Sequence, residues 1–221
     1  MERQVIAEEI NGLHLGRPND LTFDEKGRLY FTDRASSTPG YVTTGGVYRL
    51  DPPADIDSND TWSISKIIDD IHGDPVNGAD RANGLVISPD DTVLYVIETN
   101  SSTGGERTIL SYDLSEQGEA TNKTVFHRFN PGRSGDGMTV DTLGNLYVNA
   151  GLNRPRNNVD TLDTRAGVHV FEPSGRLIDF IPMPVDLVTN VAFGGIGYTT
   201  LYANSAHKVF SWENKVKGTP R

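Results

Sequence analysis

Apolar and polar residues alternate with a period of two along most of this chain, in short runs separated by turn-forming residues. One longer phrase, "GRPNDLTFDEKGRLYFTD" from Gly16 to Asp33, holds a polar turn, an alternating run, a tight turn and a second alternating run. Nearly the same phrase returns as "RANGLVISPDDTVLYVIET", "SGDGMTVDTLGNLYVNA" and "VTNVAFGGIGYTTLYANS". Alternation between turn formers predicts pairs of antiparallel strands.

The four phrases are copies of one structural unit. One column of their alignment holds the polar residue at the entry to the first strand: Asn19, Asn83, Asp136 and Asn190. A second column holds a tyrosine inside the second strand: Tyr30, Tyr95, Tyr147 and Tyr202. A third alternating run follows each phrase, and a fourth follows the first three. Four strands per unit, repeated about every 50 residues, indicate the blades of a β-propeller.

We therefore predict an all-β fold, with residues 1–221 forming one partial β-propeller domain of about four blades. The expected blades cover about 19–70, 83–129, 136–184 and 190–214. The last unit lacks a fourth strand, and residues 3–10, "RQVIAEEI", are expected to form a spare outer strand. No helical stripe of useful length occurs. An irregular β-sandwich is the alternative fold.

The residues of the first column are candidates for a cation site. In a propeller, the loops that enter the innermost strands lie at one mouth of the central channel, so these side chains would converge. Carboxylate and amide oxygens are the ligands of a hard divalent cation such as Ca²⁺. Asn and Asp also favour turns for local reasons, so any one position alone is ambiguous. Asp136 is the acid of the column, and Arg17 is either a substrate contact or a solvated surface arginine.

Composition narrows the functional class. The formal charge of −10 argues against nucleic-acid or anionic-membrane binding, since no basic stripe is visible. The absence of cysteine excludes disulfides, thiolate metal sites and cysteine nucleophiles. No apolar run is long enough for a membrane helix, and no signal peptide is visible, so we expect a cytoplasmic location. Neither a zinc-hydrolase HExxH nor a serine-hydrolase GxSxG motif occurs.

The four phrases, in this order, closely resemble those of the gluconolactonase family, which includes regucalcin and the luciferin-regenerating enzyme. The resemblance covers nearly the whole chain and implies a six-bladed type of propeller with one divalent cation in its channel. It implies metal-dependent hydrolysis of sugar lactones such as gluconolactone. The cation expected is Ca²⁺, with Zn²⁺, Mg²⁺ and Mn²⁺ as alternatives.

The resemblance also assigns roles to particular residues. Asn83 and Asp136 match metal ligands of the family, while Arg17 and Asn19 match residues that contact the substrate. Asp136 is then expected to be the catalytic carboxylate as well, orienting or deprotonating the water molecule that attacks a lactone carbonyl polarised by the cation.

One departure from the family pattern affects the function. The family has a further metal-binding glutamate in an "EGP"-like phrase of its first blade, and this chain has no such phrase. Its Met1 falls just before the family's third blade, so about two blades are expected to be absent. The alternative function is therefore a non-catalytic binding propeller or an inactive truncated member. Open blade edges are expected to favour self-association.

Overall fold

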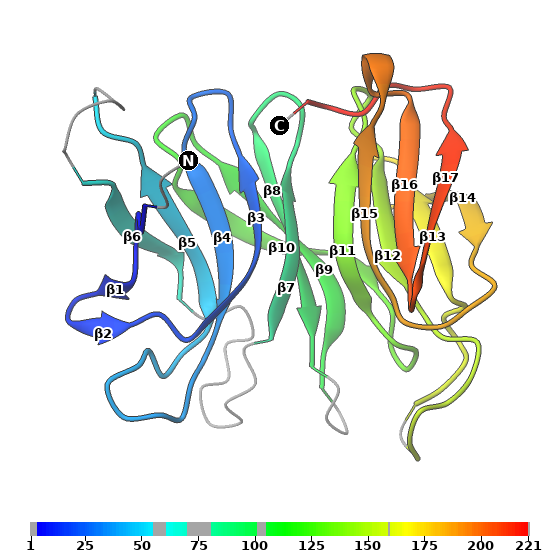
Figure 1. Ribbon diagram of the computed structural model, residues 1–221, viewed down its shortest axis with the longest axis horizontal. Coiled ribbons are helices and arrows are strands. Elements are labelled where there is room, and N and C mark those ends of the chain that lie inside the picture. The colour runs from blue at the N-terminus through cyan, green and yellow to red at the C-terminus, as the bar shows by residue number, and fades with distance from the viewer. Residues whose placement is uncertain (1–3, 55–60, 70–80, 101–104, 159, 221) are drawn as a thin grey trace.

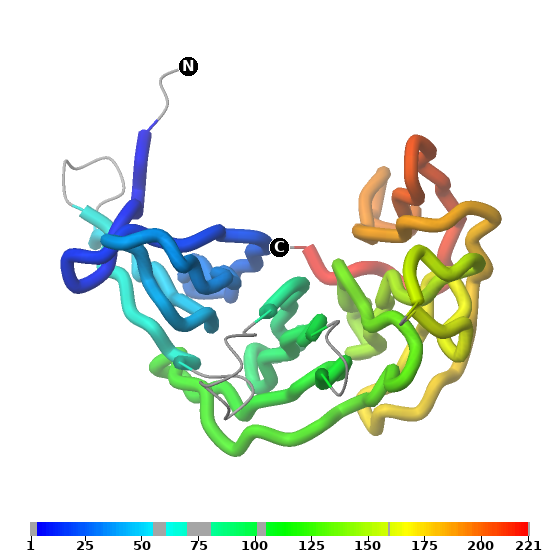
Figure 2. Tube along the Cα trace, turned by 90° about the horizontal axis from the view of Figure 1, so that it is seen from below, coloured from blue at the N-terminus to red at the C-terminus, as the bar shows by residue number. Residues whose placement is uncertain are grey.

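The computed structural model of this protein describes residues 4–54, 61–69, 81–100, 105–158 and 160–220. Four small antiparallel sheets stand side by side along an arc (Figure 1), and the view along the strands shows that the arc is open on one side (Figure 2). The all-β propeller fold predicted from the repeat is confirmed.

Each sheet is a meander in which neighbouring strands are consecutive in the sequence. The first sheet contains β3 (Arg17–Phe23), β4 (Leu29–Arg34), β5 (Gly46–Asp51) and β6 (Ser63–Ile68). The second contains β7 (Ala82–Ile87), β8 (Val93–Thr99), β9 (Arg107–Leu114) and β10 (Ala120–Arg128). The third contains β11 (Gly135–Val140), β12 (Leu146–Ala150), β13 (Gly167–Phe171) and β14 (Leu177–Pro182). The fourth contains β15 (Val188–Gly194), β16 (Thr200–Ser205) and β17 (Lys208–Glu213).

The segment before the first sheet differs from the expectation. Residue 3 lies outside the described residues, and residues 4–8 are not in strand conformation. Only β1 (Glu9–Ile10) is a strand, and it pairs with β2 (Leu13–His14) in a small hairpin. Ala7 and Ile10 pack on the outer face of the first sheet, against a cluster that includes Phe31 and Tyr48. The prediction of a spare outer strand at residues 3–10 was therefore wrong, because burial of these apolar side chains is achieved by a hairpin instead.

The hydrophobic cores lie between the blades. Tyr30 and Val47 of the first sheet pack against Leu85, Leu94 and other residues of the second. Equivalent clusters join the second sheet to the third, and the third to the fourth. Burial of two apolar sheet faces against each other is the main stabilising contribution in such layered folds. The arc is therefore held together by its blade-to-blade contacts.

The tyrosine column has a structural role in the hairpin turns. The Tyr30 hydroxyl donates to a carboxylate oxygen of Asp24 (3.0 Å), and the Tyr147 hydroxyl donates to Asp141 (3.2 Å). Each aspartate also accepts backbone N–H bonds from its own turn, such as that of Leu143 to Asp141 (2.9 Å). Aspartate at these positions thus stabilises the turn locally and anchors the tyrosine of the following strand.

Helical structure is minor in the described part of the chain. It contains one short 3₁₀ turn, Ile196–Tyr198, between the first two strands of the last sheet. Within the ranges given above, no helix has the length and apolar character needed to cross a membrane.

The exposed flanks of the arc carry apolar side chains. On the last sheet, Tyr202 is 40% exposed and Val209 is 73% exposed. Self-association through such surfaces stays a prediction.

A cluster of histidine and phenylalanine rings lies on the outer strands of the second and third sheets. The His127 ring lies 4.7 Å from that of Phe129 and 4.5 Å from that of Phe171, measured between ring centroids. Burial lowers the pKa of His127 below its ordinary value of 6.5, and the nearby His169 adds to this effect. The folded protein therefore favours the neutral imidazole at this position.

This lowered pKa predicts a loss of stability in mild acid. Below pH 6.5 the unfolded chain takes up a proton at position 127 that the folded chain resists, so the free energy of unfolding falls as the pH falls. Thermal melts of wild type and His127→Phe between pH 7.5 and 5 check this. The variant should lose less stability toward low pH, because its ring cannot ionise, and identical pH profiles for the two proteins would contradict the prediction.

Candidate functional site

The innermost strand of each blade lines the concave side of the arc. β3 contacts β7, β7 contacts β11, and β11 contacts β15, and all four begin at the lower end in the view of Figure 1. The polar residues of the first sequence column lie at or near these beginnings. The topology therefore places side chains that are more than 50 residues apart in the sequence at one mouth of the arc.

Hydrogen bonds join the first two blades at this mouth. The fully buried Thr32 hydroxyl donates to the backbone carbonyl of Asn83 (2.7 Å), and its oxygen accepts from the Asp20 backbone N–H (3.2 Å). Thr32 thus positions the start of β7 relative to β3. Asn83 itself is 6% exposed, so its amide side chain is held in a largely enclosed position.

Asn83 and Asp136 are in direct contact. The Asn83 Nδ2 donates to Asp136 Oδ1 (2.7 Å), and the guanidinium of Arg133 donates to Asp136 Oδ2 (2.8 Å). Arg133 also donates to the backbone carbonyl of Val188 (3.0 Å), which links this group to the fourth blade. The carboxylate is thereby held in one orientation by donors from its own blade and from the preceding one.

Two glycines allow the innermost strands to approach each other closely here. A Cβ atom on Gly84 would lie 2.3 Å from the backbone oxygen of Asp136, and one on Gly137 would lie 2.2 Å from Oδ1 of Asn190. Neither distance is possible without movement of the chain. Gly84 therefore lets Asn83 reach Asp136 across the gap between β7 and β11, and Gly137 lets β11 approach β15.

The other two column residues, Asn19 and Asn190, do not take part in the contact between Asn83 and Asp136. Asn19 is exposed on β3, and within the described residues no hydrogen bond joins it to Asn83 or Asp136. Asn190 is also exposed, and its side-chain oxygen accepts from the backbone N–H of Val191 (2.8 Å). Of the four column residues, the structure brings only Asn83 and Asp136 together in a direct polar contact.

Arg17 lies at the edge of the mouth. Its backbone N–H donates to the buried carboxylate of Asp33 (2.5 Å), and its guanidinium donates to the carbonyl of Ala35 (2.9 Å). The Arg17 side chain is exposed.

Asp20 is a candidate residue that the sequence pattern did not single out. It follows Asn19, and a bulge in the pairing of β3 with β4 lies at this point. Burial raises the pKa of Asp20, and the charge of Asp136 adds to this rise, while backbone hydrogen bonds from Leu21 and Leu85 oppose it. The negative charges of Asp20 and Asp136 therefore interact across the mouth. In the sequence, the signal that could have identified Asp20 was its position directly after Asn19, in the turn that enters the first strand.

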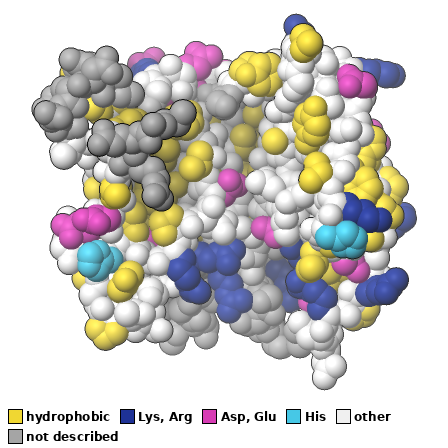
Figure 3. Space-filling model, viewed as in Figure 1, with side chains coloured by type: hydrophobic (Ala, Val, Ile, Leu, Met, Phe, Trp, Pro, Cys, Tyr) yellow, Lys and Arg dark blue, Asp and Glu magenta, His cyan; other side chains and the backbone are white. Residues whose placement is uncertain are grey.

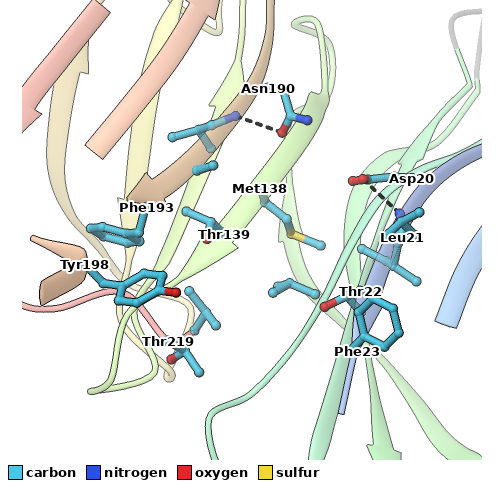
Figure 4. Close-up of a pocket in the computed structure, with 15 residues that line it drawn as sticks. Asp20, Leu21, Thr22, Phe23, Met138, Thr139, Asn190, Phe193, Tyr198 and Thr219 are labelled. Carbon is cyan, nitrogen blue, oxygen red and sulfur yellow. Dashed lines mark hydrogen bonds between the residues drawn. The ribbon is translucent and has the colours of Figure 1, made fainter. Parts of the chain in front are cut away.

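A groove of about 280 Å³ continues from Asp20 along the concave face of the arc. Figure 4 shows Asp20 and Leu21 on one wall, and Asn190, Phe193 and Tyr198 on the opposite wall. The walls beyond the polar end are mostly apolar. Such a polar end beside an apolar groove is typical of sites for small organic molecules.

The donor chemistry of the mouth suits a hard cation. Asp20 and Asp136 offer carboxylate oxygens, and Oδ1 of Asn83 accepts no hydrogen bond from the described residues. All of these potential metal-ligand atoms are oxygens, which Ca²⁺, Mg²⁺ and Mn²⁺ prefer as ligands. Across those same ranges, no group of three or more His, Cys, Asp or Glu side chains has the geometry of a metal site. A cation at this place would therefore need amide oxygens or water to complete its coordination.

Comparison with known proteins agrees with this architecture. The profile of the SMP-30/Gluconolactonase/LRE-like region matches residues 2–207. The chain is 30% identical to the gluconolactonase of Zymomonas mobilis over 237 aligned positions, covering 98% of this chain and 56% of that protein. It is 27% identical to the regucalcin of Danio rerio, covering 94% of this chain and 60% of that protein. The chain thus spans little more than half the length of these relatives.

A solved structure shows the same fold. The gluconolactonase of Xanthomonas campestris superimposes with a TM-score of 0.70 at 24% sequence identity, covering 97% of this chain and 61% of that one. At this level of identity the likeness concerns the fold, and the residues of the site have to be judged by their own geometry.

Proposed function

Because the chain belongs to the SMP-30/Gluconolactonase/LRE-like family, we propose that it hydrolyses sugar lactones at the mouth formed by Asn83 and Asp136, with a divalent cation bound there. The observation that supports this most strongly is the direct contact of Asn83 with Asp136, two oxygen-bearing residues from different blades. The relatives that match nearly the whole chain carry the names gluconolactonase and regucalcin.

In this proposal, different residues of the chain have different roles in the reaction. Asp136 accepts the proton of a water molecule while the oxygen of that water bonds to the lactone carbonyl carbon. The ring C–O bond then breaks, and Asp136 returns the proton to the departing ring oxygen, which gives the open-chain sugar acid. Arg133 and Asn83 hold the Asp136 carboxylate in position through their hydrogen bonds to its two oxygens. In this proposal the exposed side chains of Arg17 and Asn19 contact the substrate hydroxyls. The cation, when bound, polarises the carbonyl and makes the water more acidic.

The cation we propose is Ca²⁺, held by Asn83 and Asp136 with Asp20 as a further oxygen donor. Oxygen-only donors and a partly open site fit the flexible coordination of this ion, and Mg²⁺ or Mn²⁺ have similar ligand preferences. The alternative is a non-catalytic propeller that binds a sugar or a partner. One observation favours it: both oxygens of Asp136 are already engaged by donors within the protein.

A lactonase assay with and without a chelator tests the proposal. Proton release from a panel of sugar lactones is followed for the full chain after treatment with EDTA, and again after addition of Ca²⁺, Mg²⁺, Mn²⁺ or Zn²⁺. We expect the rate to fall by about tenfold or more on chelation and to return with one of these ions, since the cation supplies carbonyl polarisation and water activation. Hydrolysis that is unaffected by EDTA would remove the cation from the mechanism. No hydrolysis of any lactone under any condition would favour the binding propeller.

A further inference from the structure

A second cavity, of about 200 Å³, lies beside the Asn83–Asp136 pair and is lined largely by arginines. The arginines come from the first three blades: Arg34, Arg81, Arg107, Arg133 and Arg156. Figure 3 shows Lys and Arg side chains gathered in the lower centre of this face, near the beginnings of the innermost strands. Asp160 is the acidic residue among the described residues of the lining. This concentration of positive charge contrasts with the formal charge of −10 of the whole chain.

Described carboxylates form ion pairs with two of these arginines. Asp136 forms an ion pair with Arg133 (2.8 Å), and Asp160 forms one with Arg156 (3.1 Å). Glu98 is fully buried, and its charge acts on Arg34. Among the described residues, the lining of the cavity itself holds five arginines and one aspartate.

Arg34 makes one side-chain hydrogen bond to the described residues. Its Nε donates to the carbonyl of Ala82 (3.2 Å), and across the described ranges its other N–H groups have no hydrogen-bond acceptor. Burial lowers the pKa of Arg34, with Asp136 opposing this effect and the charges of Arg17 and Arg81 adding to it. A half-buried guanidinium that is short of acceptors and close to other cations is stabilised by an anion.

Geometry limits what the anion can be. Planar guanidinium groups bind carboxylate and phosphate oxygens through paired N–H donors. A cavity of this size accommodates a single anionic group together with part of a small sugar. Asn83 lines this cavity and also hydrogen-bonds Asp136, so the anion site and the proposed reaction site share one wall.

We propose that this arginine-lined cavity binds an oxyanion carried by the substrate, so that the preferred substrates are sugar lactones bearing a phosphate or a carboxylate group rather than neutral lactones. The inference rests on the proposed lactonase function and adds the substrate class. In this arrangement the anionic end of the molecule lies among the arginines, and its lactone carbonyl reaches Asp136. Neutral lactones lack the group that would use the unpaired donors of Arg34.

Steady-state kinetics on matched substrates test the inference. Three substrates are compared: glucono-1,5-lactone is neutral, its 6-phosphate carries a phosphate group, and a lactone of glucaric acid carries a carboxylate group. For wild type, we expect kcat/KM for one of the anionic lactones to exceed that for the neutral lactone by about tenfold to a hundredfold, the equivalent of one or two hydrogen bonds to charged groups. The anionic lactone with the higher kcat/KM shows whether the cavity prefers a phosphate or a carboxylate. Equal values for all three substrates would overturn the proposal.

Substitution of single arginines tests whether this cavity is the source of the preference for anionic over neutral lactones. Arg34→Gln should reduce the ratio of anionic to neutral kcat/KM by about tenfold or more, because the amide carries no charge and no paired donors. Arg81→Gln, at an exposed side chain, provides a second test that does not depend on the folding of the Arg34 variant. Arg176→Gln, in the remote turn where Arg176 pairs with Glu172 (2.7 Å), is the matched control and should leave the ratio unchanged. A ratio that is equally unchanged in all three variants contradicts the assignment.

A binding measurement separates this inference from the proposed activity. Isothermal titration of the full chain with 6-phosphogluconate, glucarate and gluconate requires no turnover. Tighter binding of an anionic acid to wild type than to Arg34→Gln supports the cavity even if no lactone is hydrolysed. Identical affinities of both proteins for all three acids would refute the anion site and leave the lactonase proposal standing.

Discussion

Replacing Asp136 by asparagine is expected to lower kcat for lactone hydrolysis by about 10²–10⁴-fold, the range that a positioned general base contributes. An amide at this position still offers an oxygen to a cation and still accepts the hydrogen bond from Asn83. It cannot take the proton of an attacking water molecule. The loss should therefore appear in kcat, with a smaller change in KM.

The fold should survive this substitution, since Asp136 is partly exposed and the change keeps the size of the side chain. Circular dichroism and a thermal melt establish that the variant is folded. Glu172→Gln is the matched control: it makes the same change from acid to amide in an arginine pair on the surface of the third blade, away from the mouth. A rate for Asp136→Asn close to that of the control would exclude Asp136 as the base.

Replacing Gly84 by alanine is expected to destabilise the protein by roughly 1–3 kcal/mol, the usual cost of forcing an extra group into a packed interior. The added Cβ would lie 2.3 Å from the backbone oxygen of Asp136, so one innermost strand has to move away from the other. The melting temperature should fall by roughly 2–12 °C, given about 2–4 °C per kcal/mol for a domain of this size. Lactonase activity should fall further than stability alone predicts, because the movement separates Asn83 from Asp136.

Gly194→Ala is the control for this effect. Gly194 also lies on an innermost strand, but its added Cβ would meet the ring of Tyr202 at 3.2 Å, and that ring is 40% exposed and free to adjust. The control should melt within a few degrees of wild type, whereas Gly84→Ala should not. Equal melting temperatures for Gly84→Ala and wild type would show that the close approach of β7 and β11 is not a constraint on the fold.

The blade architecture could be read from the sequence because each hairpin is specified locally. The Asp24–Tyr30 and Asp141–Tyr147 pairs form within six residues of each other, and their turns are repeated at equivalent positions. Period-two alternation then determines which face of each strand is buried. Residues 4–10 were harder to predict, because a short apolar segment next to a complete sheet can pack in several conformations.

The sequence by itself thus determined the repeat, the strand pattern and the column that contains Asn83 and Asp136, since these depend on local periodicity and turn chemistry. The tertiary structure alone decided which polar groups meet. A bulge in β3 lies beside the exposed Asn19, Asp20 lines the groove, and the close approach of β7 to β11 at Gly84 lets Asn83 reach Asp136. The five arginines of the second cavity are 23 or more residues apart in the sequence, and only the packing of three blades gathers them. Charge clusters of this kind arise from distances in space, which no linear pattern records.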